Sequence, residues 1–451
     1  MRGWASARES LLRHPVQLVP LALLGSIAVA TAALMLPAAR TAPGHAPFLT
    51  ALFTATSAVC VGGLTVVDNP QYWTSFGDVI ITVATQLGGF GVTSMAVLLT
   101  LLVTRRLELH SRLVLQAETS GMPVGHVTRL LVRIALVALI SETVITLSLA
   151  GRLWLTYDYP PGRALWYGLY HAIQAYNNCG FTLFEGSLTQ FVGDAWICLP
   201  ITFGVIVGST GFPVLFELWE RWRRPSFWTL HTRLTVAGSL VLLAVGFLAI
   251  LSIEWANPRT LGPLGLPDKL LAAFVQGTMP RTGGFSSVDY GAMREETAPI
   301  VTALMFIGGG SAGTAGGIKV TTFFLLAFVI WAEIRGEPDV VIGRRRISEA
   351  TQRQALTIAL LGVALSSVST LLLTATTSGI RFYQALFEVV SALSTTGLST
   401  GITSQLSAAG EVNLIVLLFI GRLGTVAAAS ALALNTRHRL YRYPEERPII
   451  G

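Results

Sequence analysis

The segment FIGGGSAGTAGGIKVTT, residues 306–322, has the glycine content and the lysine of a phosphate-binding loop. Six glycines lie between Gly308 and Gly317, and Lys319 follows. A Walker A loop has lysine directly after glycine, whereas here Ile318 intervenes, and it follows a strand, whereas apolar sequence flanks this segment on both sides. We therefore interpret the segment as a break in a membrane helix, where the freed backbone groups need water or protein partners.

A second glycine pattern occurs four times along the chain. In each copy, about a dozen helix-forming residues lead into a short polar or small stretch, then a glycine followed by leucine or phenylalanine. The glycines are Gly63, Gly180, Gly284 and Gly397, at intervals of 117, 104 and 113 residues. A nearly constant interval with a constant order of elements indicates four copies of one unit. The alternative is four unrelated re-entrant loops that only pack.

This repeated unit predicts a cation pathway. A helix of a dozen residues is roughly 18 Å long, too short to cross a bilayer, so it must enter the membrane and return. The returning limb leaves backbone carbonyls free, which is tolerated where they line an aqueous cavity or are buried in protein. Glycine permits positive φ, so four limbs can turn carbonyls toward one axis. The carboxyl ends of four short helices directed there also favour a cation.

The elements that must position these glycines belong to a membrane protein. The chain is 52% hydrophobic and only 12% charged, against about 25% charged residues in soluble proteins. Long apolar runs recur, each approaching the roughly 20 residues that span a bilayer, and they predict an all-α protein with eight transmembrane helices. The runs are Val16–Leu36, Val79–Val103, Leu130–Leu149, Trp196–Gly211, Leu234–Ile253, Ile300–Ile307 with Val320–Trp331, Ala355–Leu373 and Val412–Leu434.

Arginine is concentrated in alternate loops of this predicted topology. The arginines are Arg2, Arg8 and Arg13; Arg105, Arg106 and Arg112; Arg221, Arg223, Arg224 and Arg233; Arg344, Arg345, Arg346 and Arg353; and Arg437, Arg439 and Arg442. The positive-inside rule then predicts that both termini are cytoplasmic. The first apolar run is longer than the core of a usual signal peptide, so we interpret it as an uncleaved first helix.

Enzymatic chemistry is not indicated. We find no combination of nucleophile, base and orienting residue and no histidine cluster. The three cysteines, Cys60, Cys179 and Cys198, have neither metal-ligand nor redox spacing, so we expect them to pack as small apolar groups.

The motifs together resemble the Trk/Ktr/HKT superfamily of potassium transporters over essentially the whole chain. TATSAVCVGGLTVVD, NNCGFTLF, RTGGFSSVD and STTGLSTGIT look like its four pore loops, GGGSAGTAGGIKVTT like its intramembrane loop and FIGRLG like its last pore-lining helix. The ending RYPEERPIIG is similar to that of KtrB membrane subunits, and the lack of additional N-terminal spanning helices favours that branch over TrkH.

The resemblance implies residue roles. The selectivity filter would comprise Val61, Gly62, Gly63, Asn178, Cys179, Gly180, Thr282, Gly283, Gly284, Thr395, Thr396 and Gly397, with potassium held by the backbone carbonyls at the four glycines. The gate below it would comprise Gly308, Gly309, Gly310, Ser311, Ala312, Gly313, Thr314, Ala315, Gly316, Gly317 and Lys319.

Two cations near the predicted pathway have alternative roles. Lys319 either anchors the loop to carbonyls or repels cations when the loop is closed. Arg422, in the middle of the last apolar run, either reaches pore-loop carbonyls or a carboxylate, with Glu388 as a plausible partner, or lines the cavity and raises the barrier to cations. We favour anchoring for Lys319 and the barrier for Arg422.

The chain departs from the family pattern at several filter positions. Gly62 stands where threonine is usual, Cys179 and Gly283 stand where alanine is usual, and Pro280 directly precedes Arg281. These changes put the discrimination between potassium and sodium in doubt. In the related plant transporters serine at the first glycine accompanies sodium preference, so Gly63 favours potassium.

We therefore expect a channel-like potassium uptake subunit of the Ktr type in a bacterial plasma membrane, with repeats at 1–104, 105–222, 223–336 and 337–451. The alternative is a secondary active symporter that couples potassium to sodium or proton entry. Glu142 would be its coupling carboxylate, although it could simply pair with Arg133 or with loop backbone.

Partners follow from the resemblance alone. It implies a homodimer and a cytoplasmic nucleotide-binding ring subunit of the KtrA type, through which nucleotide would act. Potassium in the filter is the expected bound ion, no covalent cofactor or nucleic acid is expected, and activation by sodium is left open.

Overall fold

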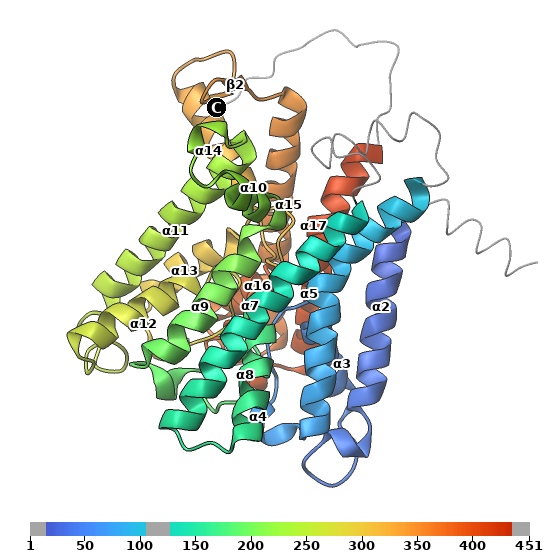
Figure 1. Ribbon diagram of the computed structural model, residues 1–451, viewed down its shortest axis with the longest axis vertical. Coiled ribbons are helices and arrows are strands. Elements are labelled where there is room, and N and C mark those ends of the chain that lie inside the picture. Colours follow the sequence, from blue (N-terminus) through green and yellow to red (C-terminus); the bar gives the residue numbers. More distant parts are fainter. Residues whose placement is uncertain (1–14, 105–126, 435–451) are drawn as a thin grey trace, which may run out of the picture.

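The computed structural model describes residues 15–104 and 127–434, which form the helical bundle of Figure 1. A two-stranded hairpin pairs β1 Val341–Ile342 with β2 Arg345–Arg346 in antiparallel register. The α-helices of the described part are α2 Pro15–Leu34, α3 Phe48–Val59, α4 Asn69–Tyr72, α5 Ser75–Thr104, α7 Val127–Thr156, α8 Pro161–Tyr176, α9 Ala195–Thr210, α10 Phe212–Arg221, α11 Leu230–Glu254, α12 Leu266–Thr278, α13 Thr297–Phe306, α14 Val320–Ile334, α15 Glu349–Thr376, α16 Phe382–Leu393 and α17 Ala408–Leu434.

The predicted apolar runs are helical, but some of them are interrupted. Within the described ranges, three helices are long and apolar enough to cross a membrane: α11, α15 and residues Leu131–Thr156 of α7. The pair α9 and α10 becomes a fourth candidate if its 101° bend is counted within one span. The sixth predicted span is also interrupted, between α13 and α14. The fold is therefore that of a helical membrane protein, and the count of eight transmembrane helices stays a prediction.

The outer surface of the bundle is apolar, as a lipid-facing surface must be. Val29 is 72% exposed, Leu155 75% and Leu371 63%. Large exposed apolar areas of this kind are unfavourable in water and ordinary against lipid tails. By contrast, Phe53 of α3 and Phe387 of α16 are almost completely buried, so short helices occupy the interior.

The four short helices predicted from the sequence are α3, α8, α12 and α16. Each packs against the long helix that precedes it, in the pairs α2–α3, α7–α8, α11–α12 and α15–α16. Prolines at the first turns of α8 and α12 suit helix starts, where the missing N–H has no helical partner. This order agrees with the expected order of elements. Four equivalent repeats around a pore, and the boundaries 1–104, 105–222, 223–336 and 337–451, stay predictions.

Two helix breaks lie against one another. Gly211, with φ of +89°, separates α9 from α10, and residues 307–319 separate α13 from α14. Backbone N–H groups of Gly310 and Thr314 donate to the carbonyls of Ser209 (2.7 Å) and Gly208 (3.1 Å). The interruption of one helix thus supplies acceptors for backbone groups freed by the other, as burial at membrane depth requires.

The orientation of the chain stays a prediction because both termini lie outside the described residues. Several of the arginines on which it rests lie there too, namely Arg2, Arg8, Arg13, Arg105, Arg106, Arg112, Arg437, Arg439 and Arg442, as does the ending RYPEERPIIG. Two described basic segments, the α10–α11 turn and the β1–β2 hairpin, both lie in the upper part of Figure 1.

Candidate functional site

The four predicted pore-loop glycines follow the ends of the short helices closely. Helices α3, α8 and α16 end four residues before Gly63, Gly180 and Gly397, respectively. Helix α12 ends six residues before Gly284, because Pro280 intervenes and has no N–H to continue the helical ladder. The third loop therefore differs from the other three in its approach to the glycine.

An unusual backbone conformation is shared by all four loops. In each loop both the glycine and the residue two positions before it have positive φ. The pairs are Val61 and Gly63 (57° and 71°), Asn178 and Gly180 (60° and 84°), Thr282 and Gly284 (70° and 73°), and Thr395 and Gly397 (47° and 90°). Positive φ is uncommon outside glycine and strained for β-branched residues. Its recurrence at matched positions indicates that the surroundings of each loop impose the same course on the backbone.

The four glycines meet in the structure. If Gly63 were replaced by a residue with a side chain, its Cβ atom would overlap the carbonyl oxygen of Cys179 and lie 3.1 Å from the Cα of Gly397. On Gly180 it would lie 2.5 Å from the Cα of Gly284. The fold thus brings together glycines that are more than 300 residues apart in the chain. At this meeting point only glycine avoids both the strain of positive φ and a collision.

Carbonyl oxygens surround this meeting point. A Cβ on Gly284 would lie 2.7 Å from the carbonyl oxygen of Cys179 and 2.8 Å from that of Thr396, and one on Gly397 would lie 2.9 Å from that of Gly62. Across the described chain, no three His, Cys, Asp or Glu side chains are grouped as metal ligands. The backbone oxygens at this point are groups that can coordinate a cation.

The departures at Gly62 and Gly283 have a structural reason. A Cβ on Gly62 would overlap the side chain of Leu418 of α17, and one on Gly283 would lie 2.6 Å from the sulfur of Met279. Large apolar side chains thus fill the space behind these two loop positions. The third departure, Cys179, is fully buried, and its sulfur lies 3.8 Å from the hydroxyl of Thr85.

The glycine-rich segment lies against the predicted pore loops. The Thr314 hydroxyl donates to the side-chain oxygen of Asn178 (3.1 Å), two residues before Gly180. A Cβ on Gly316 would overlap the carbonyl of Ser394 and the hydroxyl of Thr395, so this part of the segment directly touches the fourth loop. The predicted gate residues Gly308 to Gly317 are therefore adjacent to the second and fourth glycine loops.

Three cations hold this segment. Lys319 donates to the carbonyl of Ala315 (2.6 Å), and its role as an anchor stays a prediction. Arg422 of α17 donates to the carbonyl of Thr314 (2.6 Å) and to that of Gly88 in α5 (2.6 Å). Arg281 of the third pore loop donates to the carbonyl of Gly308 (3.2 Å), and this contact was not expected from the sequence.

The pairing of Arg422 with Glu388 is not formed. The buried Glu388 carboxylate instead accepts from the hydroxyl of Ser399 (2.6 Å), the backbone N–H of Thr400 (2.9 Å) and the hydroxyl of Thr403 (2.8 Å). Glu388 thus fixes the returning limb of the fourth loop to α16, the short helix that precedes this loop. The sequence could not reveal this, because it places a charge on a helix but not the direction in which the side chain points.

Glu142 does not pair with Arg133 either. Arg133 lies 3.5 Å from Glu220, and Glu142 accepts from the side chain of Gln86 (3.1 Å). Gln86 in turn accepts from Asn177 (2.6 Å), the residue before Asn178. The carboxylate therefore supports the second pore loop through one intermediate side chain.

An acidic residue stands five positions after the glycine in three of the four loops, a spacing that the sequence analysis missed. These residues are Asp68, Glu185 and Asp289. Burial, and then the charge of Glu185, raise the pKa of the Asp68 carboxyl. In general, ionised carboxylates attract cations to the surface that carries them.

Fold and site together define a class: helical membrane proteins whose buried centre is lined by backbone carbonyls, the arrangement of proteins that move ions. Residues 26–436 match the family model described as TrkH, cation transport protein. The Ktr system potassium uptake protein B of Bacillus subtilis is 38% identical over 97% of each chain. The Potassium/sodium uptake protein NtpJ of Enterococcus hirae is 30% identical over 97% of each chain.

A solved structure, that of the potassium transporter TrkH from Vibrio parahaemolyticus, shares this fold. It matches with a TM-score of 0.70 and 18% identity, over 95% of this chain and 86% of that one. The chain belongs to the TrkH family of cation transport proteins. The two relatives named above are a potassium uptake protein and a potassium/sodium uptake protein, and the family is one of transporters, not of enzymes, as the sequence predicts.

Proposed function

We propose that this chain is the ion-translocating, channel-like subunit of a Ktr-type potassium uptake system. Potassium is its cargo and passes through a ring of carbonyls at Gly63, Gly180, Gly284 and Gly397, with the preceding residues completing the filter. The observation that carries the proposal is the matched pair of positive φ angles in all four loops, whose glycines touch. The name of the Bacillus subtilis relative supports potassium as the ion.

The glycine-rich segment is the gate in this proposal. It touches the second and fourth loops and is held by Arg422, Lys319 and Arg281. Closure then depends on a few hydrogen bonds to backbone carbonyls, which a small change in neighbouring helices can break. Small residues let the segment move without rearranging large side chains.

Transport measurements test the proposal and separate it from its alternative. The purified protein, reconstituted in vesicles, is expected to pass potassium down its own gradient whether or not sodium or proton gradients are present. Potassium flux that requires an imposed sodium or proton gradient would instead support the symporter, with Glu142 as its coupling carboxylate. Absence of potassium flux under every gradient, with a folded protein, would contradict both.

Loosening the gate is expected to raise flux. Gly316→Ala places a methyl group against Ser394 and Thr395, which pushes the segment from the fourth loop. Deletion of Ala312 to Thr314 removes the carbonyl that binds Arg422. We expect initial potassium flux in vesicles to increase roughly tenfold, a barrier lowered by about 1.4 kcal/mol, and to depend less on a regulatory subunit.

Gly151→Ala is the matched control for Gly316→Ala, because nothing lies within 4 Å of the added methyl group. It should conduct as the parent does. If the gate variants elute as folded protein and conduct no faster than Gly151→Ala, the glycine-rich segment is not the barrier.

The remaining parts of the proposal concern assembly and place. We infer a homodimer in a bacterial plasma membrane, regulated by a cytoplasmic nucleotide-binding ring subunit of the KtrA type. The designation Ktr system in the names of relatives supports a multi-subunit assembly. Nucleotide would act only through that partner, and activation by sodium is tested by the same vesicle measurements.

A further inference from the structure

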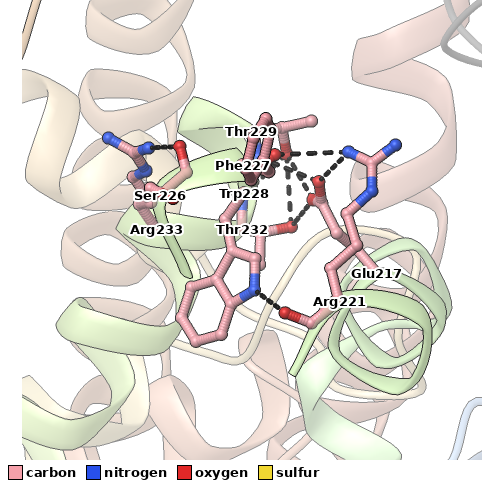
Figure 2. Close-up of polar contacts among 8 residues, drawn as sticks. All are labelled: Glu217, Arg221, Ser226, Phe227, Trp228, Thr229, Thr232 and Arg233. Atoms are coloured by element: carbon pink, nitrogen blue, oxygen red, sulfur yellow. Dashed lines mark hydrogen bonds and ion pairs between the residues drawn. The ribbon is translucent and has the colours of Figure 1, made fainter. Parts of the chain in front are cut away.

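The turn between α10 and α11 is held in one shape by Glu217. Its carboxylate accepts from the backbone N–H of Thr229 (3.0 Å), from the hydroxyl of Thr232 (2.5 Å) and from Arg221 (3.4 Å). Figure 2 shows these bonds, together with the bond from the Trp228 indole to the Arg221 carbonyl. A turn fastened at both of its helices presents its remaining side chains in a defined arrangement.

A surface pocket lies at this turn, and further arginines line it. The pocket has a volume of about 390 Å³ and is lined by Glu220, Arg221, Trp222, Arg223, Arg224 and Phe227. Its two carboxylate neighbours are engaged, since Glu217 pairs with Arg221 and Glu220 with Arg133. In the described part of the chain, Arg223 and Arg224 form no ion pair with a carboxylate. Among the described residues, the positive charge of the pocket is therefore not fully compensated.

Exposed aromatic side chains flank this charge. Trp219 is 81% exposed, Trp222 65% and Phe227 64%, and the guanidinium of Arg223 lies 4.6 Å from the centre of the Trp222 ring. Tryptophan beside arginine is the composition of the membrane interface, where rings lie at headgroup depth and basic groups contact phosphate. The turn also leads directly into α11, whose Leu240 is 62% exposed and lies within a helix able to span a membrane.

We propose that this pocket binds the headgroup of an anionic phospholipid. The phosphate contacts Arg223 and Arg224. The rings of Trp222 and Phe227 lie beside the glycerol and the upper acyl chains, and the lipid tails continue along α11. Charge complementarity favours an anion, and the exposed aromatic residues with the adjoining apolar helix favour a lipid over an acidic protein surface. The residues of this site are distinct from those of the proposed filter and gate.

Lipid binding to the full purified protein tests this inference. Detergent-purified parent and variants are titrated with phosphatidylglycerol and, separately, phosphatidylcholine, and bound lipid is measured by native mass spectrometry. Removing two basic groups in Arg223→Gln with Arg224→Gln is expected to weaken phosphatidylglycerol binding roughly thirty-fold, at about 1 kcal/mol per basic residue. Binding of phosphatidylcholine should not change.

The matched control is Arg344→Gln with Arg345→Gln, which removes the same charge from the exposed β1–β2 hairpin. This variant should bind phosphatidylglycerol as the parent does. Glu217→Gln provides a second discrimination, because it adds net positive charge while loosening the turn. If the fixed shape of the turn creates the binding pocket, that variant should bind phosphatidylglycerol more weakly. If general surface charge is responsible for binding, it should bind phosphatidylglycerol more tightly.

Several outcomes would overturn the inference. Equal loss in the pocket and hairpin variants would mean diffuse charge attraction, and no loss in either would mean no site. Displacement of the lipid by inorganic phosphate at comparable concentration would identify a site for free phosphate. Retained lipid binding in the pocket variant, with lost binding of a regulatory subunit, would identify an acidic protein partner instead.

Discussion

Gly63→Ser is expected to lower the preference for potassium over sodium by roughly tenfold or more, equivalent to about 1.4 kcal/mol of differential barrier. The side chain would overlap the carbonyl oxygen of Cys179, and the backbone would have to keep a φ of +71° that L-residues avoid. Because the oxygen that must move is one of the proposed ligands, the geometry of the carbonyl ring changes. The measurement is the ratio of potassium to sodium flux in vesicles.

Two further substitutions calibrate this result. Gly25→Ser changes an exposed position of α2 with nothing within 4 Å, so its flux ratio should equal that of the parent. Gly397→Ser is expected to shift the ratio less than Gly63→Ser, since its Cβ would approach carbonyl oxygens to 2.9 Å, a much smaller overlap than the one at Gly63. An unchanged ratio in the folded Gly63→Ser variant would exclude this glycine ring as the filter.

The parts of the site predictable from the sequence were those that depend on residue type at fixed spacing. The sequence indicates four glycines of the site, because only glycine tolerates positive φ together with close backbone approach. They are Gly63, Gly180, Gly284 and Gly397. The short helices before them are visible as apolar runs too short to cross. The second member of each φ pair, such as Val61, is not visible as such, because valine usually avoids this conformation and only its surroundings impose it.

Long-range side-chain contacts were not predictable. Arg422 is buried, as expected of a cation in the middle of an apolar run, but its partners include the carbonyls of Thr314 and Gly88, which lie 108 and 334 residues away in the chain. Every residue offers a carbonyl, so the sequence carries no mark of which one an arginine meets. The same holds for Arg281 and Gly308. The cluster at Gly208 and Gly211 could have signalled a second helix break, since glycine there permits the sharp bend.

Arg422→Ala is expected to raise potassium flux, and two physical effects act in the same direction. The guanidinium ties the gate carbonyl of Thr314 to α5, so its removal releases the segment. It is also a permanent cation beside the proposed path. At separations of about 5 to 10 Å and an effective dielectric constant of about 20, like-charge repulsion is about 2 to 3 kcal/mol, so the flux increase should be tenfold or more.

Two conservative variants separate the tether from the electrostatic barrier. Arg422→Lys keeps the charge but cannot donate to two carbonyls in the planar geometry of a guanidinium, whereas Arg422→Gln keeps an amide donor and removes the charge. If electrostatics dominates, the glutamine variant conducts faster and the lysine variant resembles the parent; if the tether dominates, the lysine variant also conducts faster. Yield from detergent extraction controls for folding, because Arg422→Ala leaves a buried carbonyl without its donor at a cost of about 1 to 3 kcal/mol. Normal yield with unaltered flux in all three variants would remove Arg422 from the gate altogether, and Lys319 and Arg281 would then be the cations left to hold the segment.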